Sequence, residues 1–363
     1  YVFLSGSILG VQPFIELEST DLYGSGMGFK ILGADGSDHF GYSVASGDVN
    51  GDGNVDIIVG APQANPYNTR ALGGIVYVLY GHDNASPYAD IDLRGISFTP
   101  EEGFMILGAS SNDNAGTSVC SVDINGDSRD DVVVGAVGGF GGSGYVFVVF
   151  GAGSISPGFL VDLANPTVGF AVIGRQSSED TGVVVTSGDV NGDGHRDVII
   201  ASSTATESGV VECGMVHVIF GHTTPTFPDI QLSTLVASAV GFNIIGAQQD
   251  EKIGTSVCSA DINEDGRDDV IIGGPTYTYN TRTQCGIVYV VFGQSTYTTD
   301  VYLLSFVSGT TTGYRIIGAM SSDSLGSGVS TIDINNDGAL DIVVGAMHAS
   351  PQSRAQAGLI TVL

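Results

Sequence analysis

Short apolar segments separated by glycine-rich and polar turns recur along the whole chain, with no helical periodicity. The first period contains four of them, at 28–33, 41–46, 55–60 and 74–81. Segments of this length and composition predict β-strands. The third segment, Asp56-Ile-Ile-Val-Gly60, is an unbroken aliphatic run, which is typical of a strand buried on both faces. Such a strand suits a small sheet packed between two other sheets.

An acidic phrase always connects the second segment of a period to the third. Its first copy runs Asp48-Val-Asn-Gly-Asp-Gly-Asn-Val-Asp, and later copies begin at Asp123, Asp189, Asp261 and Asp333. The five starts are 75, 66, 72 and 72 residues apart. Copies at that regularity establish an internal repeat, and four-stranded units of this length predict a β-propeller. The expected fold is therefore all-β, with four-stranded antiparallel blades.

The residues on either side of this phrase resemble the FG-GAP repeat of integrin α-subunit propellers. In the first repeat, Phe40-Gly41 precedes the acidic loop and Gly60-Ala61-Pro62 follows the third strand. The resemblance covers residues 28–363 and implies a propeller of five such repeats. The corresponding, degenerate residues of the later repeats are Ala115-Gly116 with Gly135-Ala136, Thr181-Gly182 with Ala201-Ser202, Ile253-Gly254 with Gly273-Gly274-Pro275, and Leu325-Gly326 with Gly345-Ala346.

The number of repeats departs from this family, whose integrin-type propellers close with seven blades. Because Tyr1–Ser5 looks like a sixth copy of the fourth strand, we interpret residues 1–27 as an extra strand and linker from a partial blade. In one interpretation residues 28–33 pair with the last strand, 358–363, and close a five-blade ring. In the other, the chain is part of a longer protein and the spare strand belongs to an incomplete blade, or pairs with a neighbouring molecule. The five repeats extend over about 28–102, 103–168, 169–240, 241–312 and 313–363.

The five acidic loops present the oxygen ligands that Ca²⁺ prefers. Side chains at loop positions 1, 3 and 5 and a carbonyl at position 7 can converge on one ion. Glycine at position 6, as in Gly53, permits the tight turn, and Ser128 is the exception. An EF-hand needs Glu at position 12, where the first loop has Val59; the FG-GAP resemblance implies that Asp at position 9 closes the ligand shell instead. Zinc is disfavoured, because no His or Cys occupies a side-chain ligand position.

We therefore predict about five Ca²⁺ ions with a stabilising, not catalytic, role, because three Asp crowd each turn and repel one another without metal. The predicted metal-site residues are Asp48, Asn50, Asp52, Asn54 and Asp56; Asp123, Asn125, Asp127, Arg129 and Asp131; Asp189, Asn191, Asp193, His195 and Asp197; Asp261, Asn263, Asp265, Arg267 and Asp269; and Asp333, Asn335, Asp337, Ala339 and Asp341.

Composition adds constraints on partners and location. The 39 Asp and Glu against 11 Lys and Arg, a formal net charge of −28, disfavour nucleic-acid binding, and no apolar run is long enough to insert into a membrane. A chain that begins at Tyr1 rather than Met suggests a mature form or a fragment. Calcium loops of modest affinity and one glycosylation sequon, Asn84-Ala-Ser86, suit an extracellular or cell-surface protein. We expect Cys120 and Cys258, at equivalent strand positions, to be buried thiols, and Cys213 and Cys285, on adjacent repeats, to be too far apart for a disulfide; the disulfide state of all four stays open.

Three cationic residues recur on the face opposite the calcium loops. Tyr67-Asn-Thr-Arg70 is repeated as Tyr279-Asn-Thr-Arg282, and Arg354 occupies the equivalent loop of the fifth repeat. These residues could form a recognition patch for a carboxylate or sugar. We favour the simpler interpretation of duplicated, solvated loops.

No sequence motif for catalysis is present, whether a Gly-x-Ser-x-Gly elbow, a phosphate loop or a His-Glu-x-x-His helix. We therefore expect a non-enzymatic, calcium-stabilised adhesion or matrix-assembly module that binds a protein or glycan ligand on the face opposite the loops. The alternatives are a carbohydrate-binding lectin of the same fold and a filament subunit that self-assembles through edge strands. An enzyme of the polysaccharide-lyase type is the least favoured.

Overall fold

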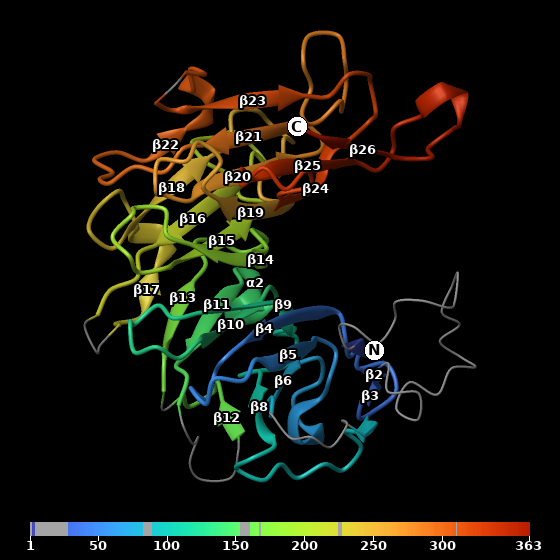
Figure 1. The fold of residues 1–363 in the computed structure, drawn as a ribbon, viewed down its shortest axis with the longest axis vertical. Coiled ribbons are helices and arrows are strands. Elements are labelled where there is room, and N and C mark those ends of the chain that lie inside the picture. The colour runs from blue at the N-terminus through green and yellow to red at the C-terminus, as the bar shows by residue number, and fades with distance from the viewer. Residues whose placement is uncertain are drawn as a thin grey trace.

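The chain folds almost entirely into β-sheets that follow one another along an arc (Figure 1), which confirms the all-β class. None of the helices in the described part of the chain is long and apolar enough to cross a membrane. The sequon and most of the predicted linker lie outside the described residues. The computed structural model describes residues 2–3, 28–82, 89–152, 160–166, 168–223, 227–309 and 311–363.

The first three large sheets each have four antiparallel strands and a fifth, parallel, strand at the outer edge. In spatial order, the first contains β4 (Ser43–Gly47), β5 (Asp56–Ala61), β6 (Ile75–Leu79), β8 (Gly103–Leu107) and β12 (Leu160–Asp162). The second contains β9 (Ala115–Val122), β10 (Asp131–Ala136), β11 (Tyr145–Val149), β13 (Phe170–Ile173) and β17 (Ile230–Gln231). The third contains β14 (Thr181–Gly188), β15 (Asp197–Ser202), β16 (Met215–Ile219), β18 (Gly241–Ile245) and β22 (Val301–Tyr302).

The remaining sheets are smaller. The fourth contains β19 (Ser256–Ala260), β20 (Asp269–Gly274), β21 (Ile287–Val291) and β23 (Gly313–Ile317). The last contains β24 (Leu325–Ile332), β25 (Asp341–Ala346) and β26 (Leu359–Val362). Two short pairs complete the described strands: β1 (Val2–Phe3) with β2 (Gly28–Phe29), and β3 (Ile31–Leu32) with β7 (Ile91–Asp92).

Each sheet is offset by one strand from the sequence repeat. The β8 strand belongs to the second repeat but pairs with β6 of the first, with Met105 opposite Tyr77. The same exchange joins β13 to β11, β18 to β16 and β23 to β21. Every repeat therefore supplies the fourth strand of the sheet before it, which ties successive sheets together through the backbone.

Residues 28–33 do not pair with the last strand. Instead β2 pairs with β1 and β3 with β7, and the one described partner of β26 is β25. The pairing that a closed five-blade ring requires is thus not formed. Figure 1 shows β1–β5 at one end of the arc and β24–β26 at the other. The β1 strand pairs antiparallel with β2, as β6 does with β8.

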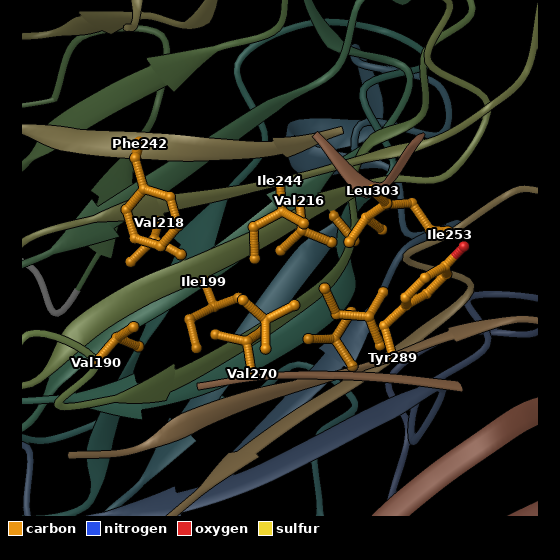
Figure 2. Close-up of a cluster of buried hydrophobic side chains, with 14 of the residues drawn as sticks. Val190, Ile199, Val216, Val218, Phe242, Ile244, Ile253, Val270, Tyr289 and Leu303 are labelled. Atoms are coloured by element: carbon orange, nitrogen blue, oxygen red, sulfur yellow. The ribbon is translucent and has the colours of Figure 1, made fainter. Parts of the chain in front are cut away.

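The middle strands form the core, as their aliphatic runs predict. Every residue of β10, β15 and β20 is buried. In Figure 2, Val190 and Ile199 of the third repeat belong to one cluster with Ile253 and Val270 of the fourth. Burying one such side chain stabilises the fold by about 1.5–3 kcal/mol. The hydrophobic core therefore lies between sheets, and each sheet depends on its neighbours.

Neighbouring sheets approach closely at the motif glycines. A Cβ atom added to Gly60 of β5 would lie 2.2 Å from the carbonyl oxygen of Gly116 in the next sheet. The Ser43 hydroxyl donates a hydrogen bond to that same carbonyl at 2.8 Å. Glycine is required here because a side chain would fill the space that the neighbouring backbone occupies. The equivalent glycine contacts are Gly135 with Gly182 and Gly273 with Gly326.

One buried position carries a histidine where the first, second and fourth repeats have an aromatic residue. His217 lies on β16 opposite Ile200, fully buried. Its Nδ1 donates to Asn243 Oδ1 at 2.7 Å, and its Nε2 accepts from the Ser202 hydroxyl at 3.2 Å. Burial lowers the pKa of His217 to about 4, so the imidazole is neutral in the folded protein.

We predict that His217 makes the fold lose stability in mild acid. Below pH 6.5 the unfolded chain binds a proton at this residue, whereas the folded chain stays neutral until about pH 4, so stability falls across that window. The shift corresponds to about 3 kcal/mol. Relative to His217→Phe, the wild type should lose about 3 kcal/mol of stability between pH 6.5 and pH 4 when urea unfolding is measured at a series of pH values. The exposed His39→Gln variant is the control, and a His217→Phe variant with the full wild-type slope would contradict the prediction.

Candidate metal centres and ligand rim

The acidic loops all join the first strand of a sheet to the second. In the first sheet Gly47 pairs with Asp56, so residues 48–55 form the turn at one end of the sheet. The loop that carries Tyr67 and Arg70 follows β5 and therefore lies at the opposite end. Because the other sheets repeat this antiparallel order, the acidic loops share one face of the arc and the predicted ligand loops share the other.

The first loop is closed by its own side chains. The Asp48 carboxylate accepts hydrogen bonds from the backbone N–H of Asp52 at 3.1 Å and of Gly53 at 2.9 Å. The Asn50 Oδ1 atom also accepts from Asp52 N–H, at 2.8 Å. Asp52 Oδ1 in turn accepts from Asn54 N–H at 2.7 Å. The predicted ligand side chains thus hold the turn and gather their oxygen atoms around it.

The same pattern recurs in the other four loops. In each, the Asp at position 1 accepts from the backbone N–H groups of positions 5 and 6 at 2.8–3.1 Å. The Asp at position 5 accepts from the N–H of position 7 at 2.9–3.1 Å. Ser128 takes the left-handed conformation of the position-6 glycines, with φ +67°, against the steric preference of a residue with a Cβ. The five predicted sites therefore share one local geometry.

The Asp at position 9 ties each of the first four loops to the end of the third strand in its sheet. Asp56 accepts from the N–H of Val49 and of Gly81, both at 2.8 Å. Its counterparts in the second, third and fourth loops make the same two bonds. These carboxylates are buried, and burial disfavours their charged form. The resulting pKa values are raised to about 6 for Asp56, 7 for Asp131, 8 for Asp197 and 6 for Asp269.

The donor set fits a hard divalent cation. Side chains at positions 1, 3, 5 and 9 present oxygen atoms, and an oxygen that accepts one N–H keeps a second lone pair for a metal. Among the described residues, no three Asp, Glu, His or Cys side chains converge closely enough to hold a metal, because the loop side chains turn toward backbone amides. A bound Ca²⁺ would supply positive charge to the carboxylates at positions 1, 5 and 9.

Successive loops touch through the side chain at position 7. A Cβ atom on Gly51 would lie 2.9 Å from Cγ of Arg129, and one on Gly192 would lie 2.7 Å from Cγ of Arg267. The guanidinium of Arg267 also lies 3.4 Å from the Asp265 carboxylate of its own loop. Position 7, expected to contribute only its carbonyl, therefore also links the second, third and fourth loops each to the preceding one.

On the opposite rim, Arg70 binds the protein itself. Its guanidinium donates to both oxygens of Asp162 at 2.6 and 2.8 Å and to the carbonyl of Gly108 at 2.7 Å. The hydrogen bonds from Arg70 lower the pKa of Asp162. The guanidinium also lies over the Tyr67 ring, 5.6 Å from its centroid. Arg70 thus joins the loop after β5 to β12 and to the end of β8.

Arg282 repeats part of this arrangement. It donates to the carbonyls of Gly318 at 2.6 Å and Ala319 at 3.2 Å, and lies 5.1 Å from the centroid of Tyr279. Arg354 is exposed and donates to the side chain of Gln352 in its own loop at 3.2 Å. Two of the three predicted rim arginines therefore anchor neighbouring loop backbone.

A recurrent acid on this rim was missed from the sequence. In every repeat it stands three residues before the first motif glycine and is buried. Glu251 Oε2 accepts from the N–H groups of Ala247 and Gln248 at 2.7 and 2.8 Å. Its Oε1 accepts from the Tyr289 hydroxyl at 2.7 Å, and burial raises the pKa of Glu251. The constant spacing of three residues between this acid and the first motif glycine is the sequence pattern that could have identified it. These acids are Asp38, Asp113, Glu179, Glu251 and Asp323.

Two cavities open on the rim at equivalent places in the second and fifth repeats. Each lies between the loop before the first strand of a sheet and the loop after its second strand, and its lining combines hydroxyl and amide groups with apolar atoms. One, of about 410 Å³, is lined by residues that include Gln284, Ser322, Asp323, His348 and Ser350. The other, of about 400 Å³, is lined by residues that include Ser111, Asn112, Asp113, Phe140 and Tyr145.

All four cysteines are free thiols. Cys120 and Cys258, which we expected to be buried, are half-buried, whereas Cys213 and Cys285 are buried. Burial raises the pKa of both Cys120 and Cys258 to about 12, so these thiols stay protonated at neutral pH. They pack as small apolar side chains.

Parts of several known proteins are similar to this chain. Phosphatidylinositol-glycan-specific phospholipase D of Rattus norvegicus is 29% identical over 250 residues, which cover 67% of this chain and 27% of that protein. Integrin alpha-7 of Mus musculus is 34% identical over 164 residues, 45% of this chain and 12% of the integrin. The V. cholerae biofilm matrix protein Bap1 aligns over 92% of this chain and 40% of its own, with a TM-score of 0.36 and 16% identity. The chain thus spans about a quarter of the length of the phospholipase.

The model of the FG-GAP repeat matches five segments, each running from the first motif glycine or its neighbours through the acidic loop to the third strand of the sheet. The segments are 40–79, 115–149, 181–219, 253–291 and 325–363. Together they cover more than half of the chain. The protein therefore belongs to the FG-GAP repeat family and resembles the integrin α-subunits.

Proposed function

We propose that this chain is a non-catalytic binding module, stabilised by about five Ca²⁺ ions, that acts outside the cell in adhesion or matrix assembly. The observation that carries the proposal is the common geometry of the five acidic loops, which face the same way and present the same oxygen atoms. The FG-GAP repeats and the similarity to integrin alpha-7 support a binding role and an extracellular or cell-surface location.

Calcium counters the interaction that most destabilises these loops, which is the repulsion between their crowded negative charges. Asp48, Asp52 and Asp56 lie within nine residues, and Asp56 is buried with a raised pKa. A divalent cation beside them favours the charged carboxylates and offsets their mutual repulsion. The side chains at position 7 of the second, third and fourth loops contact the preceding loop, so ordering one of these loops also restrains its neighbour. Calcium therefore stabilises the whole row of turns.

The ligand binds on the opposite rim, where the two cavities lie. Their hydroxyl, amide and carboxylate groups suit a polar, uncharged ligand such as a glycan, with a protein ligand as the other class. The cavity of the fifth repeat adds the exposed Met320 as an apolar contact. A lectin of the same fold is therefore the second candidate function.

A catalytic role is not proposed, although one relative is named as a phospholipase. The buried pair Ser202 and His217 has no contact with solvent, so a substrate cannot reach it. Ser324 and His348 meet at the rim cavity at 3.1 Å, but the carboxylate of the adjacent Asp323 accepts from Met320 N–H. Neither pair therefore forms the oriented nucleophile and base that hydrolysis requires.

We predict that calcium raises the melting temperature and binds with a stoichiometry near five. A site occupied at 100 times its dissociation constant adds roughly 2.7 kcal/mol of stability. Asp193→Asn keeps a hydrogen-bond acceptor but removes a charge, so calorimetric titration should show one site fewer and a smaller calcium-induced rise in melting temperature. Asp250→Asn, on the exposed rim, is the matched control. Identical melting in calcium and EGTA would contradict the assignment.

For the ligand, we predict that Met320→Arg abolishes binding on an array of glycans and immobilised matrix proteins while the calcium response of the fold is retained. The longer, charged side chain occupies the rim cavity of the fifth repeat. Leu304→Arg alters a side chain that is equally exposed and lies outside both cavities, so it should bind like the wild type. Equal loss of ligand binding in both variants would contradict the placement of the ligand site on the rim.

We predict that Arg70→Ala lowers the free energy of unfolding by about 1–2 kcal/mol, because it leaves Asp162 and the Gly108 carbonyl without their donor. Arg354→Ala, which removes one contact within its own exposed loop, should change stability by less than about 0.5 kcal/mol. Chemical denaturation in calcium measures both. Equal effects of the two changes would show that the anchoring by Arg70 contributes nothing specific.

A further inference from the structure

Two of the five acidic loops are bonded to the backbone of the loop that precedes them. In the second loop, Asp130 stands at position 8, between the predicted ligands at positions 7 and 9, and is half-buried. Its carboxylate accepts a hydrogen bond from the backbone N–H of Asp48 at 2.9 Å, and its own N–H donates to the Asp48 carbonyl at 2.9 Å. Asp268 of the fourth loop makes the same two bonds with Asp189 of the third, each 2.9 Å long. Both partners, Asp48 and Asp189, are the position-1 residues of their loops.

Among the described residues, the other two junctions between loops lack this pair of bonds. Position 8 of the third loop is Arg196, whose guanidinium donates to the Ser187 carbonyl of its own repeat at 3.0 Å. Position 8 of the fifth loop is Leu340, whose side chain has no hydrogen-bonding group. The first loop is therefore bonded in this way to the second, and the third to the fourth.

A glycine just before position 1 makes room for the acid of the next loop. A Cβ atom on Gly47 would lie 2.5 Å from Oδ2 of Asp130, and one on Gly188 would lie 2.8 Å from Oδ2 of Asp268. Neither distance leaves room for a side chain, so the bonded pair requires glycine at this place. The glycine and the acid thus occur together, at the two junctions that form the bonds. The residues that stand before the other three loops are Val122, Ala260 and Ile332.

We propose that Asp130 and Asp268 are positioning residues for the calcium sites of the preceding loops, so that calcium binding is coupled within two pairs of loops. The inference rests on the proposed calcium role. Asp48 and Asp189 supply the position-1 carboxylates of their sites, and the acid at position 8 of the next loop holds the backbone N–H and carbonyl of each.

The coupling follows from the place of the acid in its own loop. Position 8 lies between the predicted ligands at positions 7 and 9, so an ion that orders those ligands also holds the acid in place. The acid in turn holds the position-1 residue of the preceding loop. Binding at either loop then lowers the ordering entropy that binding at the other must overcome, and the effect is reciprocal.

The test follows calcium binding loop by loop. Hydrogen exchange read by mass spectrometry, on the full chain at increasing calcium concentration, gives a half-protection concentration for the peptide of each loop. We expect Asp130→Ala to raise this concentration roughly fivefold or more in the first loop and to leave the third loop unchanged. Asp268→Ala should raise the value for the third loop and not for the first. Leu340→Ala, at position 8 of a loop without these bonds, is the matched control and should leave the fourth loop as in the wild type.

Three further variants separate positioning from charge. Asp130→Asn removes the charge but keeps an oxygen atom that accepts from Asp48 N–H, so it should retain the wild-type value in the first loop. Gly47→Ala keeps the charge but displaces the carboxylate, so it should act like Asp130→Ala. Asp127→Asn alters a predicted ligand of the second loop. It should raise the half-protection concentration of the first loop in the wild type but not in the Asp130→Ala background.

Circular dichroism and melting in calcium verify that each variant is folded. The proposal is overturned if Asp130→Ala leaves the first loop at its wild-type value, if Asp130→Asn shifts that value as much as Asp130→Ala, or if Asp127→Asn affects the first and third loops equally. In each of these cases calcium still protects the wild-type loops, and the calcium assignment stands. A wild type without calcium-dependent protection in any loop would refute the calcium assignment itself, and the coupling with it.

Discussion

The close approach of backbones at the motif glycines sets the dimensions of the whole molecule. Where Gly60 meets Gly116, less space remains than one methyl group needs. This contact brings neighbouring sheets near enough for Val, Ile and Ala side chains to fill the remaining gap, so that the second strand of an inner sheet is buried on both sides. It also places the acidic loops next to one another, within reach of a single arginine side chain.

The features that could be predicted from the sequence depend on residues close together in the chain. The acidic turn, its glycine and the aliphatic strand after it form one continuous stretch, and five copies of that stretch make the pattern clear. The offset between sheet and repeat could not be predicted in this way. The apolar pattern of 103–107 predicts a strand, but nothing in it says that the partner is β6 of the preceding repeat rather than a strand of its own.

The candidate sites show the same difference between features set by neighbouring residues and features set by residues far apart in the chain. Position 1, 3 and 5 side chains were assigned from spacing alone, and the structure places them around one turn. The Asp at position 9 also binds a residue that is distant in the sequence. Asp56 accepts a hydrogen bond from the backbone N–H of Gly81, which lies 25 residues beyond it at the end of the third strand. The partner of Arg70 is 92 residues away, and no local pattern indicates Asp162. Long-range partners of this kind decide whether a charged rim residue is available to a ligand or holds a loop in place.

Because each repeat after the first lends at least its first strand to the sheet before it, the architecture tolerates changes of length in whole periods. Deleting or duplicating one full period, wherever the cut falls, restores matching strand edges and the same glycine contacts on both sides of the join. A cut of any other length leaves one sheet without an edge strand and its neighbour with an extra one. Gene duplication can therefore lengthen such an array without the invention of a new interface, as in other repeat proteins.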